Sequence, residues 1–531
     1  MIKMKTNFKV LQSVILLLFC MYTFAFNNAA MAEGNTYYVS PKGYDFYSGS
    51  VDKPWGTLQH AFSQLKAGDT LYVRGGTYTE ISESKYGIKL ESPKSGTEDN
   101  RICVFAYEGE VPVLDFSNVT GAGMRWGFYM DNVNYWHFRG LHITKLNQPE
   151  TGNMSLAFLA QNSNNNIFEL LECYENKAAG FRIDGASEGN LILNCDFYNN
   201  YDPYTASPGN NADGVQIASI TYRQGNPRVN TLKGCRAWYN SDDGFDFWKN
   251  EGTVIVEDCW AFNNGRDKGD GNGFKLGKTE QPREGCITKR VLIRCIAANN
   301  RKWGINNNAA DLDAEFLNII CFDNDSRAFY LDMDVDMHVT IKNSISYKHN
   351  YADRFGEYAT TEHNNWDSGN VTVSDDDFIS IDHSLLESER QKDGSLPETD
   401  YLKLKKGSDL IDAGVDVGLP YIGTAPDIGA YEYDPTTGFS INTIDSDFKI
   451  YPNPSDTGIF NIRWSRKIQS NQLKIDVYNI QGKLISQDQL NNTSIQGQQG
   501  KINLSEKEPG SYIVRLSDNS IYYSCKVILN H

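Results

Sequence analysis

The chain has 531 residues, more than one ordinary domain holds, and a formal net charge of -17 at pH 7. This acidic balance argues against a broad electrostatic grip on nucleic acid, so we expect no nucleic-acid partner. It does not exclude an anionic substrate, because a locally basic cleft or a bound cation reverses the sign of the potential at one site.

The first 32 residues have the pattern of a signal peptide. Three lysines precede the apolar run "VILLLFCMYTFAF" at 14–26, and Ala30-Met31-Ala32 forms a small-x-small cleavage site. The run is short for a membrane span. We therefore expect residues 1–32 to be removed and the mature protein to be secreted or held at the cell surface.

The following residues predict a strand, a turn-rich loop, an amphipathic helix over 57–66 and a second strand. A helix at this place covers the open end of a stack of strands, which otherwise exposes unpaired backbone groups. An N-terminal capping helix is therefore expected.

Six segments between residues 170 and 331 share one frame, an apolar strand followed by Cys and then Asn. This repeat predicts a right-handed parallel β-helix over residues 33–435, in which like residues of successive coils stack. We expect the cysteines to be free thiols in the core, and 405–433 to form the last irregular coils. The repeated residues are Cys173, Cys195, Cys235, Cys259, Cys295 and Cys321, with Asn176, Asn199, Asn240, Asn263, Asn299 and Asn324.

After about residue 436 the pattern changes to alternating strands with turn signals. It predicts a linker over 436–445 and a small β-sandwich over 446–531, so the fold class is all-β throughout. The stretches "YPNP" at 451–454, "YNIQG" at 478–482 and "PGSYI" at 509–513 resemble the C-terminal sorting domain of type IX secretion substrates. That resemblance implies the type IX secretion machinery as a partner. The alternative is a general β accessory or sugar-binding module.

A glycine recurs after the Asn turn of five coils, and the two residues that follow it should lie on opposite faces of a strand. Alternate side chains of a strand share a face. The residue after each glycine is mostly apolar and should point inward, and the next should point outward. The outward column would contain Arg182, Gln216, Asp246, Lys275 and Asn306, behind Gly180, Gly214, Gly244, Gly273 and Gly304.

Four carboxylates should converge beside this column: Asp213 on one coil, and Asp242, Asp243 and Asp246 on the next. Carboxylates packed together repel one another unless a cation lies among them. Ca²⁺ takes six to eight oxygen ligands at about 2.3–2.6 Å, which suits this set. The alternative is that "SDDG" at 241–244 is only a turn, since Asp and Gly favour turns.

Residues of about 35–435 resemble polysaccharide lyase family nine, the β-helical pectate lyases. The resemblance lies in "NADG" at 211–214, "CRAWYNSDDGFD" at 235–246, "NGFKLG" at 272–277 and "RQKDGSLPETDYLKL" at 390–404. It implies that Asp213, Asp242, Asp243 and Asp246 bind Ca²⁺ and that Lys275 is the catalytic base.

The implied reaction is β-elimination in polygalacturonate-type pectin, an anionic plant-type polysaccharide. A lysine base must be neutral, and its ordinary pKa is about 10.4. A nearby Ca²⁺ lowers that pKa, whereas the aspartates without the metal raise it. We therefore expect Ca²⁺ dependence and an alkaline optimum.

Candidate partners for substrate carboxylates are cationic side chains near the site in coil register, with Arg182 ranked first. The others are Lys249, Arg266, Lys268 and Lys302, and Trp248 and Tyr239 could stack on sugars. A monomer is expected. A β-helical hydrolase is disfavoured, because no histidine lies between His142 and His338. A rhamnogalacturonan lyase of the same fold and a non-catalytic polysaccharide-binding β-helix stay open as alternatives.

Overall fold

The structure is a computed structural model that describes residues 34–434, except 80–83, 151, 281–286, 336 and 368–370, and residues 448–530, except 465–472, 480–483, 491–498 and 518–521. The expected signal peptide and the 436–445 linker lie outside the described residues. Two compact units are present: the first holds the residues up to Val417 together with Asp427–Tyr431, and the second holds Gly418–Pro426 and the residues from Glu432 onward. Among the described helices, none is long and apolar enough to cross a membrane.

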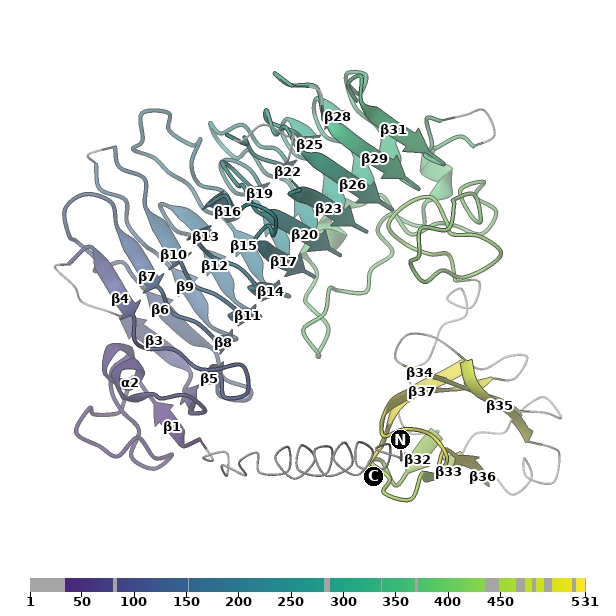
Figure 1. Cartoon of the computed structure of the whole chain (residues 1–531), viewed down its shortest axis with the longest axis horizontal. Coiled ribbons are helices and arrows are strands. Elements are labelled where there is room, and N and C mark those ends of the chain that lie inside the picture. The colour runs from purple at the N-terminus through teal and green to yellow at the C-terminus, as the bar shows by residue number, and fades with distance from the viewer. Residues whose placement is uncertain are drawn as a thin grey trace, which may run out of the picture. The chain divides into compact units, whose positions relative to one another are not determined.

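The first unit is a right-handed parallel β-helix, as predicted, and its described strands form three sheets that run side by side along the stack (Figure 1). The twelve-stranded sheet consists of β1 (Thr36–Val39), β2 (Thr70–Val73), β5 (Ile102–Ala106), β8 (Trp136–Arg139), β11 (Ile167–Glu169), β14 (Leu191–Leu193), β17 (Val229–Lys233), β20 (Thr253–Glu257), β23 (Lys289–Ile293), β26 (Asp313–Leu317), β29 (His338–Lys342) and β31 (Ala359–Glu362).

The nine-stranded sheet consists of β4 (Tyr86–Glu91), β7 (Trp126–Asp131), β10 (Leu156–Gln161), β13 (Ala179–Gly185), β16 (Val215–Ile220), β19 (Phe245–Asp246), β22 (Phe274–Lys275), β25 (Trp303–Asn306) and β28 (Arg327–Tyr330). The ten-stranded sheet consists of β3 (Gly76–Thr79), β6 (Pro112–Asp115), β9 (His142–Thr144), β12 (Glu172–Tyr174), β15 (Asp196–Tyr198), β18 (Arg236–Trp238), β21 (Trp260–Phe262), β24 (Ile296–Ala298), β27 (Ile320–Phe322) and β30 (Ile345–Tyr347).

Stacked side chains fill the interior of the coils. The rings of Phe128, Phe158 and Phe181 lie on successive strands of the nine-stranded sheet, with centroids 4.6 and 5.0 Å apart. All three are fully buried. The parallel pairing places identical positions of neighbouring coils about one strand spacing apart, so like residues pack on like.

An asparagine ladder runs inside the turn that follows the ten-stranded sheet, but the prediction had three of its members wrong by one residue. The ladder consists of Asn176, Asn200, Asn240, Asn264, Asn300 and Asn324, each donating from Nδ2 to the Oδ1 of the next at 2.9–3.1 Å. Asn199, Asn263 and Asn299 precede ladder members and have positive φ. In each Asn-Asn pair the first residue makes the left-handed turn that Asn tolerates, and the second points inward.

The six predicted cysteines are free thiols and all are buried, as expected. They do not form one ladder. Cys195, Cys235, Cys259 and Cys295 each precede a strand of the ten-stranded sheet, whereas Cys173 and Cys321 lie within their strands and pair with Phe197 and Ala297. Either position is filled by a small apolar side chain, which is how a buried thiol behaves.

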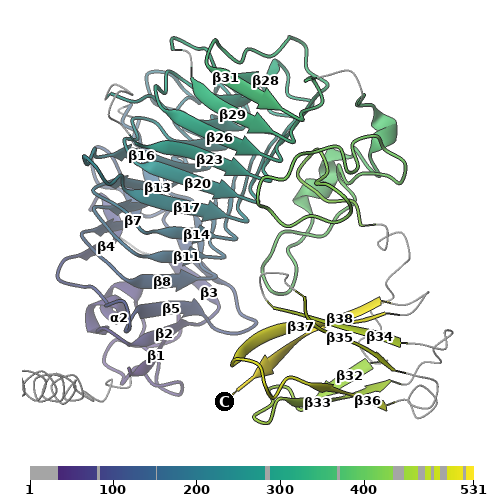
Figure 2. The same cartoon turned by 45° about the vertical axis from the view of Figure 1, so that its right-hand side comes forward.

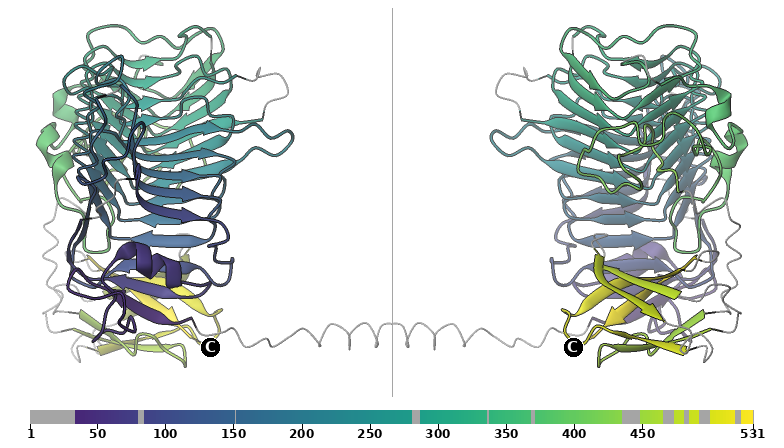
Figure 3. Two further views of the ribbon diagram at one scale, coloured as in Figure 1. Left: turned by 90° about the vertical axis from the view of Figure 1, so that its left-hand side faces the viewer. Right: turned by 90° about the vertical axis from the view of Figure 1, so that its right-hand side faces the viewer.

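The predicted capping helix is present as α2 (Leu58–Gln64), with Thr57 as its N-cap. Figures 1 and 3 show it, in purple, at the N-terminal end of the stack. The Phe62 ring contacts the rings of Phe128 and Trp136 edge-on, at 5.6 and 6.1 Å between centroids. The helix therefore covers apolar side chains that the first coils would otherwise expose.

The prediction that residues 405–433 form the last coils was wrong. The last described strand of the stack is β31. The described residues 371–434 contain two short 3-10 helices, Asp375–Asp377 and His383–Glu387, two isolated β-bridges, and otherwise turns and irregular backbone. The part of this segment that belongs to the first unit, up to Val417 and over Asp427–Tyr431, lies alongside the stack (Figure 2). Arg390 is bonded to Asp196 of β15, and Asn318 donates to the Asp427 carbonyl, so the segment packs on coils formed much earlier in the chain.

The second unit contains two small antiparallel sheets that share one apolar core. The strands are β32 (Phe448–Tyr451), β33 (Ile459–Trp464) and β36 (Gln499–Asn503) in one sheet, and β34 (Leu473–Asn479), β35 (Leu484–Leu490), β37 (Gly510–Ser517) and β38 (Tyr522–Leu529) in the other. The predicted β-sandwich is confirmed.

Candidate active site

The outward column of the nine-stranded sheet is present as predicted. The strand pairing aligns Arg182, Gln216, Asp246, Lys275 and Asn306 on neighbouring strands. The residue before each of these is fully buried inside the coils. These five residues are Phe181, Val215, Phe245, Phe274 and Ile305. Because strand side chains alternate, the polar column faces outward.

Glycines set the line from which the site is built. A Cβ atom on Gly214 would lie 2.8 Å from both the Gly244 carbonyl oxygen and the Nδ2 of Asn240, and one on Gly244 would lie 2.9 Å from both the Gly273 oxygen and Asn264 Nδ2. No other residue lets the coils and the asparagine ladder approach so closely. The residues before these glycines therefore line up from coil to coil.

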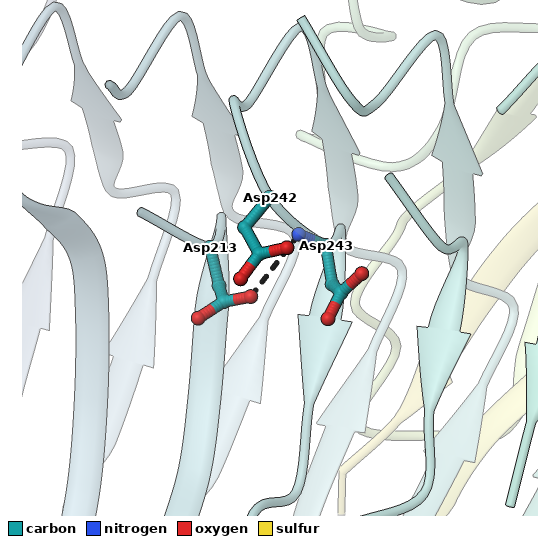
Figure 4. Close-up of side chains that lie close together, drawn as sticks. All are labelled: Asp213, Asp242 and Asp243. Atoms are coloured by element: carbon teal, nitrogen blue, oxygen red, sulfur yellow. Dashed lines mark hydrogen bonds between the residues drawn. The ribbon is translucent and has the colours of Figure 1, made fainter. Parts of the chain in front are cut away.

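Three carboxylates from two coils meet at this line (Figure 4). The side chains of Asp213, Asp242 and Asp243 are buried, and one oxygen of each lies within 4.8 Å of the others. The Asp243 backbone N–H donates to Asp213 Oδ1 at 3.1 Å, and the Asn272 N–H donates to Asp243 Oδ1 at 2.8 Å. Each carboxylate is thus held by the backbone of the coil that follows it.

The fourth predicted aspartate, Asp246, lies beside this group of three and contacts the lysine. Lys275 Nζ is 2.9 Å from Asp243 Oδ2 and 3.5 Å from Asp246 Oδ2. The Lys275 side chain is 15% exposed, whereas both carboxylates are buried. The predicted base therefore lies at the boundary between the buried acids and the outer face.

The electrostatics of the site are unbalanced. Burial raises the pKa of Asp213 and Asp242 well above the ordinary value, and neighbouring carboxylates raise it further. For Lys275, burial alone would lower the pKa, but the facing carboxylates, led by Asp243 and Asp246, raise it well above the ordinary value. This agrees with the predicted effect of the aspartates without a metal, and it means that the lysine is held cationic.

The donor set fits a hard divalent cation. The residues present carboxylate and amide oxygens, which Ca²⁺ prefers. Within the described part of the chain, no hydrogen-bond donor reaches the buried Asp246 Oδ1 or Asn272 Oδ1. Buried polar atoms are nearly always partnered, so such atoms beside a carboxylate cluster indicate a missing positive partner.

A loop over residues 265–271 closes one side of the carboxylate group. The Asp270 N–H donates to Asp242 Oδ1 at 3.0 Å. Gly265 and Gly271 pack on one another at the neck of the loop, and Arg301 Nη1 donates to the carbonyls of Asp267 and Gly269 at 2.9 and 3.1 Å. Arg301 could not be identified from the sequence, because its partners are backbone carbonyls.

Asn272 and Gln216 also belong to the site. Asn272 binds Asp243 through both its backbone and its side chain, and Gln216 Nε2 donates to Asp213 Oδ2. Asn272 stands before Gly273 as Asp243 stands before Gly244, and that matched spacing was the signal available in the sequence.

The predicted substrate-binding cations differ in their surroundings. Arg182 lies in the column and donates to Gln216 Oε1 at 3.2 Å and to Ser219 Oγ at 2.9 Å. The remaining cations are held by loop residues: Lys249 pairs with Glu280, Lys302 with Asp270 and Arg266 with Asp267, and Lys268 packs against Gly209.

The two predicted stacking residues are separated. Trp248 lies beside Lys275, with 6.0 Å between Nζ and the ring centroid. The Tyr239 hydroxyl instead donates to Glu387 Oε1 at 2.6 Å, in the segment that lies alongside the stack. Only Trp248 is therefore placed beside the lysine.

The parallel β-helix and the carboxylate group beside Lys275 define a β-helical protein of the polysaccharide lyase class. Residues 37–365 match the Pel9A-like right-handed β-helix family, and the chain belongs to that family. Residues 449–530 match the secretion system C-terminal sorting domain, as the sequence predicted.

Curated relatives and solved structures agree with this assignment. Pectate lyase L of Dickeya chrysanthemi is 32% identical over 409 residues, covering 75% of this chain and 90% of the relative. Pectate lyase PEL9 of Emericella nidulans is 30% identical over 407 residues, covering 70% and 93%. The crystal structure of pectate lyase Pel9A superposes with a TM-score of 0.64 at 28% identity, covering 76% of this chain and 97% of that one. The structure of a rhamnogalacturonan lyase superposes with a TM-score of 0.62 at 26% identity, covering 70% of this chain and 97% of that one.

Proposed function

We propose that this protein cleaves polygalacturonate-type pectin by Ca²⁺-dependent β-elimination, with Lys275 as the base. The observation that carries the proposal is the contact of Lys275 Nζ with Asp243 and Asp246, at 2.9 and 3.5 Å, beside a group of carboxylates able to hold a metal. Ca²⁺ would be held by Asp213, Asp242, Asp243 and Asp246. The similarity to pectate lyases at about 30% identity supports the choice of substrate.

In this reaction Lys275 Nζ takes the C5 proton, which is acidic because it is α to the uronate carboxylate. The electron pair forms the C4–C5 double bond, the C4–O bond breaks, and the leaving oxygen takes a proton from solvent. When bound, the cation supplies positive charge that stabilises the developing negative charge on the substrate carboxylate and lowers the lysine pKa. Without it the four aspartates keep Lys275 charged, so the protein's own residues make the activity conditional on the metal.

Arg182 is the side chain that we assign to a substrate carboxylate. It lies two strands from Asp246 in the same column, and its bonds to Gln216 and Ser219 fix its guanidinium at the surface of the sheet. Lys249, Arg266 and Lys302 are secondary candidates because they lie outside this column. All four cations have a carboxylate partner, and that of Arg182 is Asp184, at 3.2 Å.

The same site could act on rhamnogalacturonan, and the solved rhamnogalacturonan lyase of similar fold favours keeping this as a second candidate. For export we propose a signal peptide at 1–32, a lyase domain at 33–435, a linker at 436–445 and a type IX sorting domain at 446–531. The protein would then be secreted or held at the cell surface as a monomer.

Ultraviolet absorbance of unsaturated uronate tests the proposal. The mature protein is mixed with polygalacturonate at alkaline pH, with Ca²⁺ and separately with chelator. We expect a rise with Ca²⁺ only, and a loss of about 10³-fold or more in Lys275→Ala with an unchanged fold. A rise on rhamnogalacturonan alone would move the substrate to that polymer. A rise that persists in chelator would contradict the Ca²⁺ dependence, and binding of polymer without any rise would favour a non-catalytic β-helix.

A further inference from the structure

Trp248 is an exposed aromatic residue beside the lysine. It follows Asp246 by two residues, the residue is 37% exposed, and its ring centroid is 6.0 Å from Lys275 Nζ. The neighbouring rings of Phe245 and Phe274 are fully buried inside the coils. The indole therefore provides apolar surface at a site otherwise built from charged and polar groups.

The segment that carries Trp248 is fixed by a buried arginine. Arg290 is fully buried, and it donates to the carbonyl oxygens of Asn250 at 2.7 Å, Gly252 at 2.6 Å and Leu276 at 3.0 Å. Its guanidinium thus ties the turn after β19 to the end of β22. A burial of this kind, with several charge-assisted hydrogen bonds, holds the local backbone in one arrangement.

A glycine brings the two strand ends together. Gly277 has a φ of +84°, and a Cβ atom there would lie 1.7 Å from the Phe247 carbonyl oxygen. From the other side, the Ser219 N–H donates to the Trp248 carbonyl oxygen at 2.8 Å. The backbone of Trp248 is therefore fixed relative to β16 and β22, while much of its side chain stays accessible.

We propose that the Trp248 indole is a stacking platform for the sugar ring next to the one that loses its C5 proton. The ligand class is a pyranose of a uronate-containing chain, bound through the face that carries its C–H groups. The inference rests on the proposed function. Successive strands of a sheet lie about 4.8 Å apart, so a polymer that crosses them with one ring at Lys275 brings its neighbour close to the indole.

This contact differs in kind from the ionic ones around it. Aromatic contact depends on buried apolar area and ring geometry, and salt screens it little, whereas the pairing of Arg182 with a carboxylate weakens as ionic strength rises. Because the platform is already held in place, binding loses little conformational freedom there. Trp248 thus gives the site an affinity that high salt does not remove.

Calorimetric titration with polygalacturonate in a Lys275→Ala background tests the platform without turnover. We expect Trp248→Ala to weaken binding about ten-fold and Trp248→Phe to retain most of the affinity, with the same ratio at low and high salt. Phe46→Ala is the matched control, because Phe46 is an 81% exposed aromatic residue near the N-terminal end of the stack. It should leave binding unchanged. In the wild-type background, Trp248→Ala should raise KM more than it lowers kcat.

Separate titrations with Ca²⁺ distinguish stacking from disturbance of the metal site, and we expect the same Ca²⁺ affinity in all variants. The parent of these variants is Lys275→Ala. The platform would be overturned if Trp248→Ala in this background bound polymer as tightly as the parent does. It would also be overturned if Trp248→Ala lost affinity for Ca²⁺ in parallel with its affinity for polymer. If the parent binds polymer through Trp248 and the wild type releases no unsaturated product, the platform stands and the lyase proposal fails. If the Lys275→Ala parent binds neither polygalacturonate nor rhamnogalacturonan, the platform is overturned, and the ultraviolet assay on the wild type decides the lyase proposal.

Discussion

Two clusters of charged side chains, each with buried carboxylates or a buried carboxylate at its centre, lie in the same β-helix, and their charge balance differs. On the ten-stranded sheet, Asp196 is bonded to Arg236 at 2.7 Å and to Arg390 at 2.6 Å. On the nine-stranded sheet, Lys275 contacts two carboxylates of a cluster whose members are Asp213, Asp242, Asp243 and Asp246, and it is the one cation that forms an ion pair with them among the described residues.

The first cluster is complete and the second is short of positive charge. Although burial opposes it, the two arginines lower the pKa of Asp196, so this carboxylate is stable as an anion. In the second cluster burial and mutual repulsion raise the pKa of Asp213 and Asp242. A buried charge is retained for structure when its partners are built in. A deficit indicates a partner supplied from outside, which is why we place the cation there.

The largest expected effect is on metal binding. Asp243→Asn removes a charge at the centre of the second cluster, so Ca²⁺ affinity should fall by more than about 100-fold, as measured by calorimetry. Asp267→Asn on the neighbouring loop is the control, because its side chain is 55% exposed and pairs with Arg266. A Ca²⁺ affinity within three-fold of wild type in Asp243→Asn would break the comparison.

Stability should change unequally at the two clusters. Asp196→Asn leaves the buried Arg236 and the partly buried Arg390 without their carboxylate and should cost about 3–5 kcal/mol of unfolding free energy. Asp213→Asn in chelator removes one of several repelling charges, so it should cost far less or stabilise. Denaturant unfolding of both variants gives the two values, and similar losses would contradict the contrast.

The pH dependence of stability should have opposite signs at the two clusters. Asp196 has a lowered folded pKa, so its contribution is fully present above its unfolded pKa of about 3.9 and is lost as pH falls through the folded value. Asp213 has a raised folded pKa, so its cost is present above that value and is relieved as pH falls toward about 3.9.

In chelator, the free energy of unfolding of the wild type should therefore increase relative to that of Asp213→Asn as the pH falls through this range. The advantage of the wild type over Asp196→Asn should hold to about pH 4 and then shrink. The reverse order of these two differences would show that the charge states have been assigned to the wrong clusters.

The smallest expected effect is at the loop that closes the second cluster. Arg301→Ala frees the carbonyls of Asp267 and Gly269, so Asp270 should hold Asp242 less well. We expect Ca²⁺ affinity to fall by about three- to ten-fold, toward the lower end seen for groups that orient metal ligands. Arg301→Lys should recover part of it, and the exposed Arg266→Ala should have no effect. An unchanged affinity in Arg301→Ala would leave the loop without this role.

The column of the second cluster could be predicted because it depends on local rules. Side chains alternate along a strand, and recurring glycines mark equivalent positions, so Asp246 and Lys275 fall on one face. The prediction of the asparagine ladder was wrong at Asn199 and its equivalents, because either residue of an Asn-Asn pair fits the sequence pattern. Only the backbone conformation decides which one turns and which points inward.

The first cluster could not be predicted, because its parts are distant in the chain. Arg390 lies 194 residues after Asp196, in a segment with no periodic pattern. Residues 390–404 of this segment resemble a motif of the lyase family, and in the structure Arg390 holds the segment on the stack. Arg301 and Arg290 were missed for a related reason, since they bind backbone carbonyls, which leave no mark in the sequence.

Calorimetric titration of the wild-type chain with Ca²⁺, paired with unfolding temperature, tests the central claim most directly. The deficit in the second cluster predicts one Ca²⁺ per chain, abolished by Asp243→Asn, and an unfolding temperature of the β-helix that rises with free Ca²⁺ as ligand binding to the native state requires. If the titration gives no binding heat and the unfolding temperature does not shift, the claim that these carboxylates bind a cation is contradicted.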